Sequence, residues 1–256
     1  MLCRSEDYFT FARDYALLDI AAHQGNDFQV TDEFWARINR TTRRFYDRGR
    51  FVTFPGYEWS GNTPLGGDRN VYYRSEGGRI TRACRDLIPG GAARDADSPT
   101  ARDLFANLRG SGPFVFAHVG GRYADLAIHE EGLEPAVEVH SAWGTFEWLL
   151  DEALTRGYRV GIVANSDGHC GRPGASYPGA SHFGSLGGLT CVLAPRLDRG
   201  AIHEAILSRH MYATTGHRCL MDVTVRMGDG RTAIMGDVIE AGAGEATLRA
   251  DRKSGV

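Results

Sequence analysis

Short apolar stretches typical of β-strands alternate with helical patterns along most of the chain. The predicted strands cover Leu17 to Ala22, Phe51 to Pro55, Pro113 to Ala117, Ala136 to Val139, Val160 to Asn165 and Leu189 to Leu193. The predicted helices cover Asp32 to Asp47, Ala101 to Arg109, Thr145 to Arg156 and Arg199 to Leu207. This order is typical of parallel sheets built from βα units, whose strands are covered on both faces. The alternation therefore predicts an α/β fold.

Two threonines are predicted to cap helices. Thr31 and Thr100 each stand directly before a helical pattern, and the spacing from Thr100 to Asp103 resembles a capping box. Two connecting stretches, Ser60 to Asp68 and Gly77 to Ser98, are long for a compact domain. Because loops of that length are more often functional than idle, we expect both to lie near a site.

The length of the chain fits one large domain with a small addition. Domains of the α/β barrel type reach about 250 residues, and this chain has 256. From Met221 onward the pattern changes to alternating apolar residues and Gly-rich turns. We therefore predict a main α/β domain over residues 1–220 and a small β-rich segment over residues 221–256.

The charge and the apolar content argue against two classes of partner. The chain has 29 basic and 32 acidic residues and a net charge of −3, so no overall positive field attracts nucleic acid or an anionic membrane. It has no run of about 18 apolar residues that would span a bilayer. The 5 cysteines form no Cys-x-x-Cys pair and suit a reducing compartment. We expect a cytoplasmic protein that acts on a small molecule.

Histidines and carboxylates stand where the predicted strands end. In chain order they are His23, Glu58, His118, His140, and the pair Asp167 and His169. Because ligands of parallel α/β folds bind at the carboxyl ends of the strands, we expect these side chains to share one rim. Imidazole and carboxylate groups together suit zinc, manganese or iron, and several of each can hold more than one ion. The pattern predicts a metal centre that lowers the pKa of a bound water.

The individual residues leave alternatives open. His118 follows an apolar run and could instead be a hydrogen-bonded core histidine. Glu58 lies between two aromatic residues, where a carboxylate is costly to bury unpaired, so a metal or an arginine is expected beside it. His140 is equally a candidate for substrate binding. Asp167 and His169 are two residues apart and can point the same way, although this spacing alone is a weak signal.

The position of His23 is the least secure. Three polar residues close to it, Gln24, Asn26 and Asp27, could take its place at the rim. Its spacing alone does not decide among them.

Six motifs occur in order along the chain: Phe54 to Gly61, Asp68 to Tyr73, Phe116 to His118, Val137 to His140, Asn165 to His169, and Tyr212 to Arg218. Taken together, they resemble the PHP superfamily, which is named for polymerase and histidinol phosphatase. The last of these is similar to an uncharacterised bacterial branch, and the resemblance runs from about Tyr8 to about Asp222. It implies a distorted barrel of seven β/α units, two or three divalent metal ions, and phosphoester hydrolysis.

The resemblance also implies roles for individual residues. Glu58 matches the bridging carboxylate of the family, His118 its mid-chain histidine ligand, and Asp167 with His169 its late Asp-x-His pair. The family begins with a His-x-His pair on its first strand, but no histidine precedes His23 in this chain. The family's Thr-Asp-His is likewise replaced by Ala-Ala-His at positions 21–23. An N-terminally truncated gene or a degenerate member would explain this, and we favour truncation, with a barrel that lacks its first strand.

Two functions from different classes follow. The first is a metal-dependent phosphoesterase in which Glu58, Asp167 and His169 are catalytic and a metal-activated water attacks a small anionic ester. Arg69 and Arg122 would neutralise the substrate, because a guanidinium matches phosphate oxygens. The second is a catalytically inactive PHP-like domain that binds or regulates, or an inactive fragment of a longer enzyme.

Overall fold

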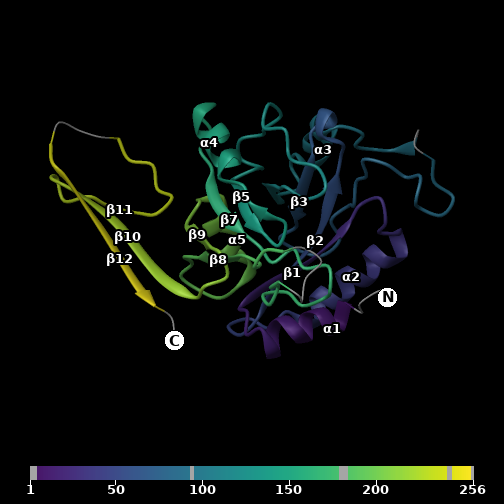
Figure 1. Ribbon diagram of the computed structural model, residues 1–256, viewed down its shortest axis with the longest axis horizontal. Helices are drawn as coiled ribbons and strands as arrows, with labels where there is room; N and C mark the ends of the chain where they lie inside the picture. Colours follow the sequence, from purple (N-terminus) through teal and green to yellow (C-terminus); the bar gives the residue numbers. More distant parts are fainter. Residues whose placement is uncertain (1–4, 93–94, 179–183, 241–243, 255–256) are drawn as a thin grey trace.

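A mixed sheet forms the centre of the molecule (Figure 1). The computed structural model describes residues 5–92, 95–178, 184–240 and 244–254. Its main sheet contains β1 (Ile20–Asn26), β2 (Val52–Ser60), β3 (Asp68–Tyr72), β4 (Phe114–Ala117), β5 (Ala136–Ser141), β6 (Gly144–Thr145) and β7 (Gly161–Ala164). The strands follow the order β1-β2-β3-β4-β5-β6, and β7 also pairs with β5.

The sheet is a curled half-barrel. β1 with β2, β4 with β5, and β5 with β7 are parallel, as βα units require. However, β3 is antiparallel to both β2 and β4, and β1 is an edge strand of this sheet. The predicted α/β class is confirmed. The exact barrel of seven β/α units is not, because an antiparallel strand interrupts the parallel order.

The helices cover the sheet, and two of them begin at the predicted N-cap threonines. They are α1 (Ser5–Thr10), α2 (Asp32–Phe45), α3 (Ala101–Leu108), α4 (Glu147–Thr155) and α5 (Arg199–Leu207), with a π-helical turn at Phe11–Tyr15 and a 3-10 turn at Thr63–Leu65. Thr31 accepts a hydrogen bond from the backbone N–H of Phe34, and Thr100 forms the expected capping box with Asp103. The helix α1 and the π-helical turn were not predicted.

Two smaller sheets complete the described chain. β8 (Leu189–Val192) pairs antiparallel with β9 (Met211–Thr214) next to β7. β10 (Cys219–Met227) pairs with β11 (Thr232–Ile234) and β12 (Ala246–Ser254) in an antiparallel sheet that extends away from the main sheet (Figure 1). No described helix combines the length and the apolar character needed to cross a bilayer.

The alternation of side chains along β2 separates two cores. Tyr57 and Trp59 point to the outer face and pack with α2 and α3. Phe54 points to the inner face, where it packs with Phe114 and with Ile206 of α5. Because successive residues of a strand face opposite sides, Glu58 shares the inner face with Phe54. The inner face is therefore apolar at one end and polar at the other.

Candidate metal centre

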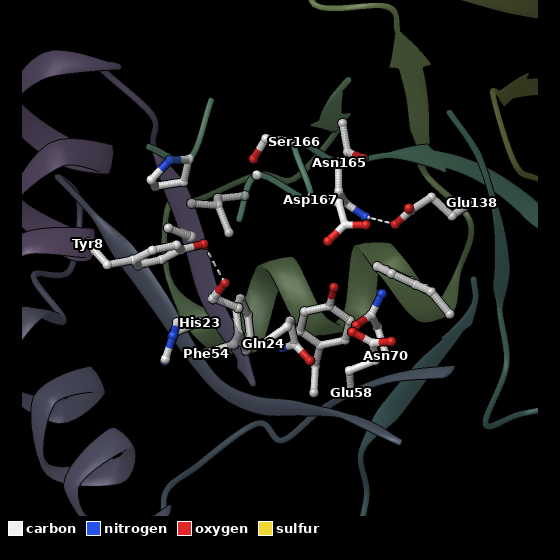
Figure 2. A pocket seen from close by; sticks show the side chains of 18 of the residues that line it. Tyr8, His23, Gln24, Phe54, Glu58, Asn70, Glu138, Asn165, Ser166 and Asp167 are labelled. Atoms are coloured by element: carbon white, nitrogen blue, oxygen red, sulfur yellow. Dashed lines mark hydrogen bonds between the residues drawn. The ribbon is translucent and has the colours of Figure 1, made fainter. Parts of the chain in front are cut away.

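A cavity of about 450 Å³ opens over the inner face of the curled sheet. Its walls come from β1 on one side and from β7, β8 and the segment after β7 on the other. Glu58 and Asp167 reach into it from opposite sides (Figure 2). A volume of this size is in the range of small-molecule sites, so the cavity can take a ligand.

His118 is held between two carboxylates beside this cavity. It follows β4 and is only 1% exposed. Its Nδ1 donates to Glu138 Oε1 over 2.8 Å, and its Nε2 lies 3.4 Å from Asp167 Oδ2. Asn165 donates to the other oxygen of Glu138, which fixes that carboxylate in turn (Figure 2). The Glu138 contact sets the tautomer of the ring and directs Nε2 toward Asp167, as in metal-bound histidines.

The charges around His118 shift two pKa values. Burial alone would lower the pKa of His118, but Glu138 and Asp167 together raise it well above its usual range. Burial would likewise raise the pKa of Asp167, yet the contact with His118 lowers it below the ordinary value. In the absence of another cation, a protonated imidazole thus supplies the positive charge that the carboxylates need.

Glu58 and Asp68 add two further carboxylates. Burial raises the pKa of Glu58 to about 8, and Asp68 and Asp167 raise it while the charge of His118 opposes them. Ser60 Oγ lies 3.3 Å from Glu58 Oε1 and donates to it. Asp68 is fully buried, and burial raises its pKa, although Arg122 donates to both of its oxygens at 3.1 and 2.8 Å. Like charges this close favour a bound cation.

The backbone at Asp167 has an unusual conformation. Its φ of 37° lies in the left-handed region, which residues with a side chain seldom adopt. Such conformations cluster at functional sites, where the surrounding structure holds them in place. Asp167 Oδ2 is also buried, and His118 Nε2 faces it at 3.4 Å, which is too far for a well-formed hydrogen bond. The turn therefore places an incompletely paired carboxylate oxygen against His118.

Gly120 keeps open the volume between two of these groups. A Cβ at this position would lie 2.9 Å from Asp68 Oδ2 and 2.9 Å from His118 Nε2. Imidazole and carboxylate donors that border one unfilled volume fit a divalent cation in their chemistry. Among the residues that the structure describes, however, no three His, Cys, Asp or Glu side chains are arranged around one point. Closing a complete set of ligands requires side-chain movement.

Three of the predicted metal residues meet here, and one lies next to them. Glu58, His118 and Asp167 are the group brought together. His169 lines the cavity but is exposed, with Nδ1 3.1 Å from the backbone O of Asp167 and its ring centroid 6.0 Å from that of Trp143.

His23 lies apart from this group. It lines the other end of the cavity, where its ring packs on Tyr8 and Phe34 with centroid distances of 5.1 and 6.0 Å (Figure 2). Burial lowers the pKa of His23 to about 4, and its Nδ1 has no hydrogen-bond partner among the residues that the structure describes. The neutral ring could bind a ligand, but the structure does not bring it to the Glu58 group.

The predicted roles of His140 and Arg69 do not fit their positions. Both ring nitrogens of His140 are engaged, Nδ1 with Thr145 Oγ1 and Nε2 with the carbonyl of Leu186, each at 2.8 Å. Since a carbonyl only accepts, Nε2 carries the proton and Nδ1 accepts from the hydroxyl, so no lone pair is left for a metal. The register of β5 against β7 shifts between Glu138 and His140. Because of this irregularity, the side chains of the two residues do not point the same way, although they are two residues apart.

Arg69 points to the outer face of β3, away from the cavity. It is fully buried, and its Nε donates to Glu134 Oε1 over 3.1 Å. Its other nitrogens donate to the carbonyls of Gly66, Asp125 and Ile128. With these partners in place, Arg69 is inaccessible to a substrate. Arg122, in contrast, keeps 29% of its side chain exposed beside Asp68.

The sequence analysis did not select Asp68, Glu138, Asn70 or Asn165 as site residues. Asp68 and Asn70 lie on β3, which runs against its neighbours and so brings its first residues to the carboxyl ends of β2 and β4. Glu138 precedes His140 by two residues within β5. The sequence analysis missed it because only residues at the ends of the predicted strands were considered. A search for polar residues at alternate positions within the strands would have found Glu138.

Comparisons with known proteins give a family of unknown function and one distant relative. Residues 3–111, fewer than half of the chain, match a family described as a protein of unknown function, DUF3604. An uncharacterized protein of Chlamydia pneumoniae is 24% identical over 261 residues, which cover 93% of this chain and 40% of that protein. The chain thus spans 40% of the length of this curated relative.

A solved structure also aligns with most of the chain. It is a two-domain protein of Bacteroides vulgatus, described as containing a predicted PHP-like metal-dependent phosphoesterase. The identity is 12%, the TM-score is 0.48, and the alignment covers 97% of this chain and 82% of the other.

Proposed function

We propose that this chain is a metal-dependent hydrolase of phosphoesters or related small anionic esters. The observation that carries the proposal is the placement of His118, with Nδ1 on Glu138 and Nε2 turned toward Asp167. The same carboxylate–histidine pairing orients metal-bound imidazoles in enzymes. The PHP-like motifs agree with this assignment, and Glu58, His118 and Asp167 are the residues proposed to hold the ion.

The bound cation would activate a water molecule and neutralise the developing charge on the ester. Zinc, manganese or iron suits the imidazole and carboxylate donors, and more than one ion fits the number of carboxylates. Glu138 keeps the proton of His118 on Nδ1, so Nε2 stays available as a donor atom. His169 lies at the exposed side of the cavity. It is proposed to move toward the ion and complete the set of metal ligands.

Glu58 is proposed to bind the ion as a carboxylate. Its pKa of about 8 in the metal-free chain means that a proton leaves Glu58 when the cation binds near neutral pH, and Ser60 orients its Oε1. Arg122 is the proposed contact for the substrate anion. It is already fixed through Asp68, and the exposed part of its guanidinium can donate hydrogen bonds to phosphate oxygens in a planar arrangement.

One observation favours the second candidate, a domain that binds without catalysis. Within the described ranges, no three potential ligands are arranged around one point, and His140 is committed elsewhere. A protein that binds a metal or an anion weakly, with no turnover, would have these properties. The same experiment separates the two functions.

Metal content and turnover test both candidates. Purified protein, dialysed and reloaded with Mn²⁺ or Zn²⁺, is analysed for bound metal and assayed with p-nitrophenyl phosphate. Asp167→Asn tolerates the left-handed backbone and removes the charge, so we expect metal affinity and kcat/KM to fall by about a hundredfold or more. Asp229→Asn, on an exposed turn, is the matched control and should change neither.

The outcomes are distinct. Metal binding with hydrolysis that depends on Asp167 supports the hydrolase. Metal binding without turnover on a panel of phosphomonoesters and phosphodiesters supports the binding domain. An unchanged metal stoichiometry in Asp167→Asn would overturn the assignment of this residue.

A further inference from the structure

Gln24 places two unpaired polar atoms at the cavity. Both Nε2 and Oε1 are shielded from solvent, and neither has a hydrogen-bond partner among the described residues. Gln24 lines the cavity together with Glu58 and Asp167, and it lies between His23 and Asn70 in the view of Figure 2. Leaving a buried donor and a buried acceptor unpaired is destabilising. The arrangement is explained if a ligand supplies the missing partners.

The neighbouring strand leaves room for this amide. The register of β1 and β2 pairs Gln24 with Gly56, and a Cβ on Gly56 would overlap Gln24 Nε2. Any larger residue at position 56 would displace the amide from its place. The same register pairs Asn26 with Glu58. Gln24 is two residues before Asn26 on β1, so it lies on the same face as Asn26 and next to the proposed metal centre.

The chemistry of the amide restricts what can pair with it. An anionic oxygen would accept from Nε2 but would be repelled by Oε1, because the carbonyl oxygen only accepts. A cis amide, as in a lactam ring, presents one N–H and one C=O on the same edge and satisfies both atoms, whereas the N–H and C=O of a trans amide point in opposite directions. Beyond Gln24 the cavity is apolar, with Phe54, Val192 and Ile206 in its lining. The cavity thus changes from carboxylates to an amide and then to an apolar floor.

We propose that Gln24 is a substrate-binding residue that recognises a cis amide of the kind found in a lactam ring. The substrate class is an anionic ester whose organic part carries that group next to the ester and ends in an apolar portion. This inference rests on the proposed function, because that function places the ester at the metal centre. The pairing of Gln24 with the substrate requires binding only and does not require hydrolysis.

Two matched probes test the pairing. (5-Oxopyrrolidin-2-yl)methyl phosphate carries a cis amide in a lactam ring, and cyclopentylmethyl phosphate has a ring of the same size without one. Binding is measured by isothermal titration calorimetry and phosphate release separately, with Mn²⁺-loaded protein. We expect the amide probe to bind about tenfold more tightly in the native chain, and Gln24→Leu to abolish this preference by weakening the amide probe alone. Gln29→Leu, an exposed residue that also lines the cavity, is the control and should keep the preference.

A second readout needs no ligand. Because Gln24→Leu removes two unpaired buried polar atoms, it should raise the Tm of the ligand-free protein by about 3 °C, whereas a glutamine with a structural role would lower it on removal. Amide preference without phosphate release supports Gln24 and overturns the hydrolase. Equal kcat/KM for both probes, or a lower Tm in Gln24→Leu, overturns the role of Gln24 and leaves the hydrolase standing. No binding of either probe overturns this substrate class.

Discussion

Two buried clusters of charged side chains flank β3, and they differ in how completely their polar atoms are paired. On the outer face, Arg69 binds Glu134 and three backbone carbonyls, and His129 Nδ1 lies 2.8 Å from the second oxygen of Glu134. In that cluster, the positive and negative groups compensate one another. This pairing is what a buried ion pair needs in order to be tolerated.

On the inner face, negative charge exceeds positive charge. Four carboxylates, those of Glu58, Asp68, Glu138 and Asp167, surround one imidazole and one guanidinium. One oxygen of Asp167 is buried without a well-formed hydrogen bond from any described residue, although His118 Nε2 lies 3.4 Å away. The difference teaches that burial and charge do not by themselves identify a functional site. The outer cluster stabilises the fold, whereas the inner cluster is left incomplete in a way that a cation would complete.

Breaking the outer cluster should have the largest effect on stability. Glu134→Ala leaves the Arg69 charge buried without its carboxylate, so the free energy of unfolding should fall by about 3–5 kcal/mol in urea denaturation. Glu130→Ala removes a carboxylate whose partner Arg109 is 60% exposed, and should cost about 1 kcal/mol or less. Equal losses in the two variants would show that the outer cluster is no more important than a surface ion pair.

Neutralising one carboxylate of the inner cluster should stabilise the chain, whereas breaking the outer cluster should destabilise it. The pKa of Glu58 in the folded chain, about 8, lies above the ordinary 4.5, so its contribution to stability is fully present below about pH 4.5 and is lost as the pH rises through 8. In metal-free protein, Glu58→Gln should therefore raise the free energy of unfolding at pH 9 by about 3 kcal/mol and change little at pH 4.

Glu33→Gln, on the exposed side of α2, serves as the control for that measurement. Adding Mn²⁺ should remove the advantage of the Glu58 variant at pH 9, because the native carboxylate gains a cation. A variant that is less stable at pH 9 would contradict the like-charge cluster.

The smallest effect is expected at the far end of the cavity. The pKa of His23, about 4, lies below the ordinary 6.5, so its contribution to stability is present above pH 6.5 and is lost as the pH falls toward 4. His23→Phe should remove this loss and gain about 2 kcal/mol relative to the native chain at pH 4, with little difference at pH 7. His217→Phe, at an exposed position, should show no such pH dependence.

The helices and most parallel strands could be predicted because their signals are local. Thr100 with Asp103 defines a helix start through neighbouring atoms, and the α5 helix has the predicted bounds of Arg199–Leu207. The strand β3 could not be predicted in this way. Its residues are buried on both faces, yet they include Asp68, Arg69 and Asn70, whose polarity reads as a loop until their partners across the fold are known.

The candidate site could be predicted only in part for the same reason. His118 and Asp167 follow β4 and β7, and Glu58 lies near the end of β2, so all three were found by position along the chain. The directions of Arg69 and His140 depend on strand alternation and on an irregularity in β5, neither of which the spacing of the sequence reveals. Arg69 and Asp68 are consecutive, so a shift of one residue in the register exchanges their faces.

Gly120 shows that the inner cluster also depends on a residue without a functional group. Alanine at this position would place a methyl carbon between Asp68 and His118. This carbon would fill the volume between the two side chains, although every acidic and imidazole group stayed in place. A related chain could therefore carry every one of these charged residues and still have no open volume between them. A comparison of related chains should first include the residue at this glycine position, and not the charged residues alone.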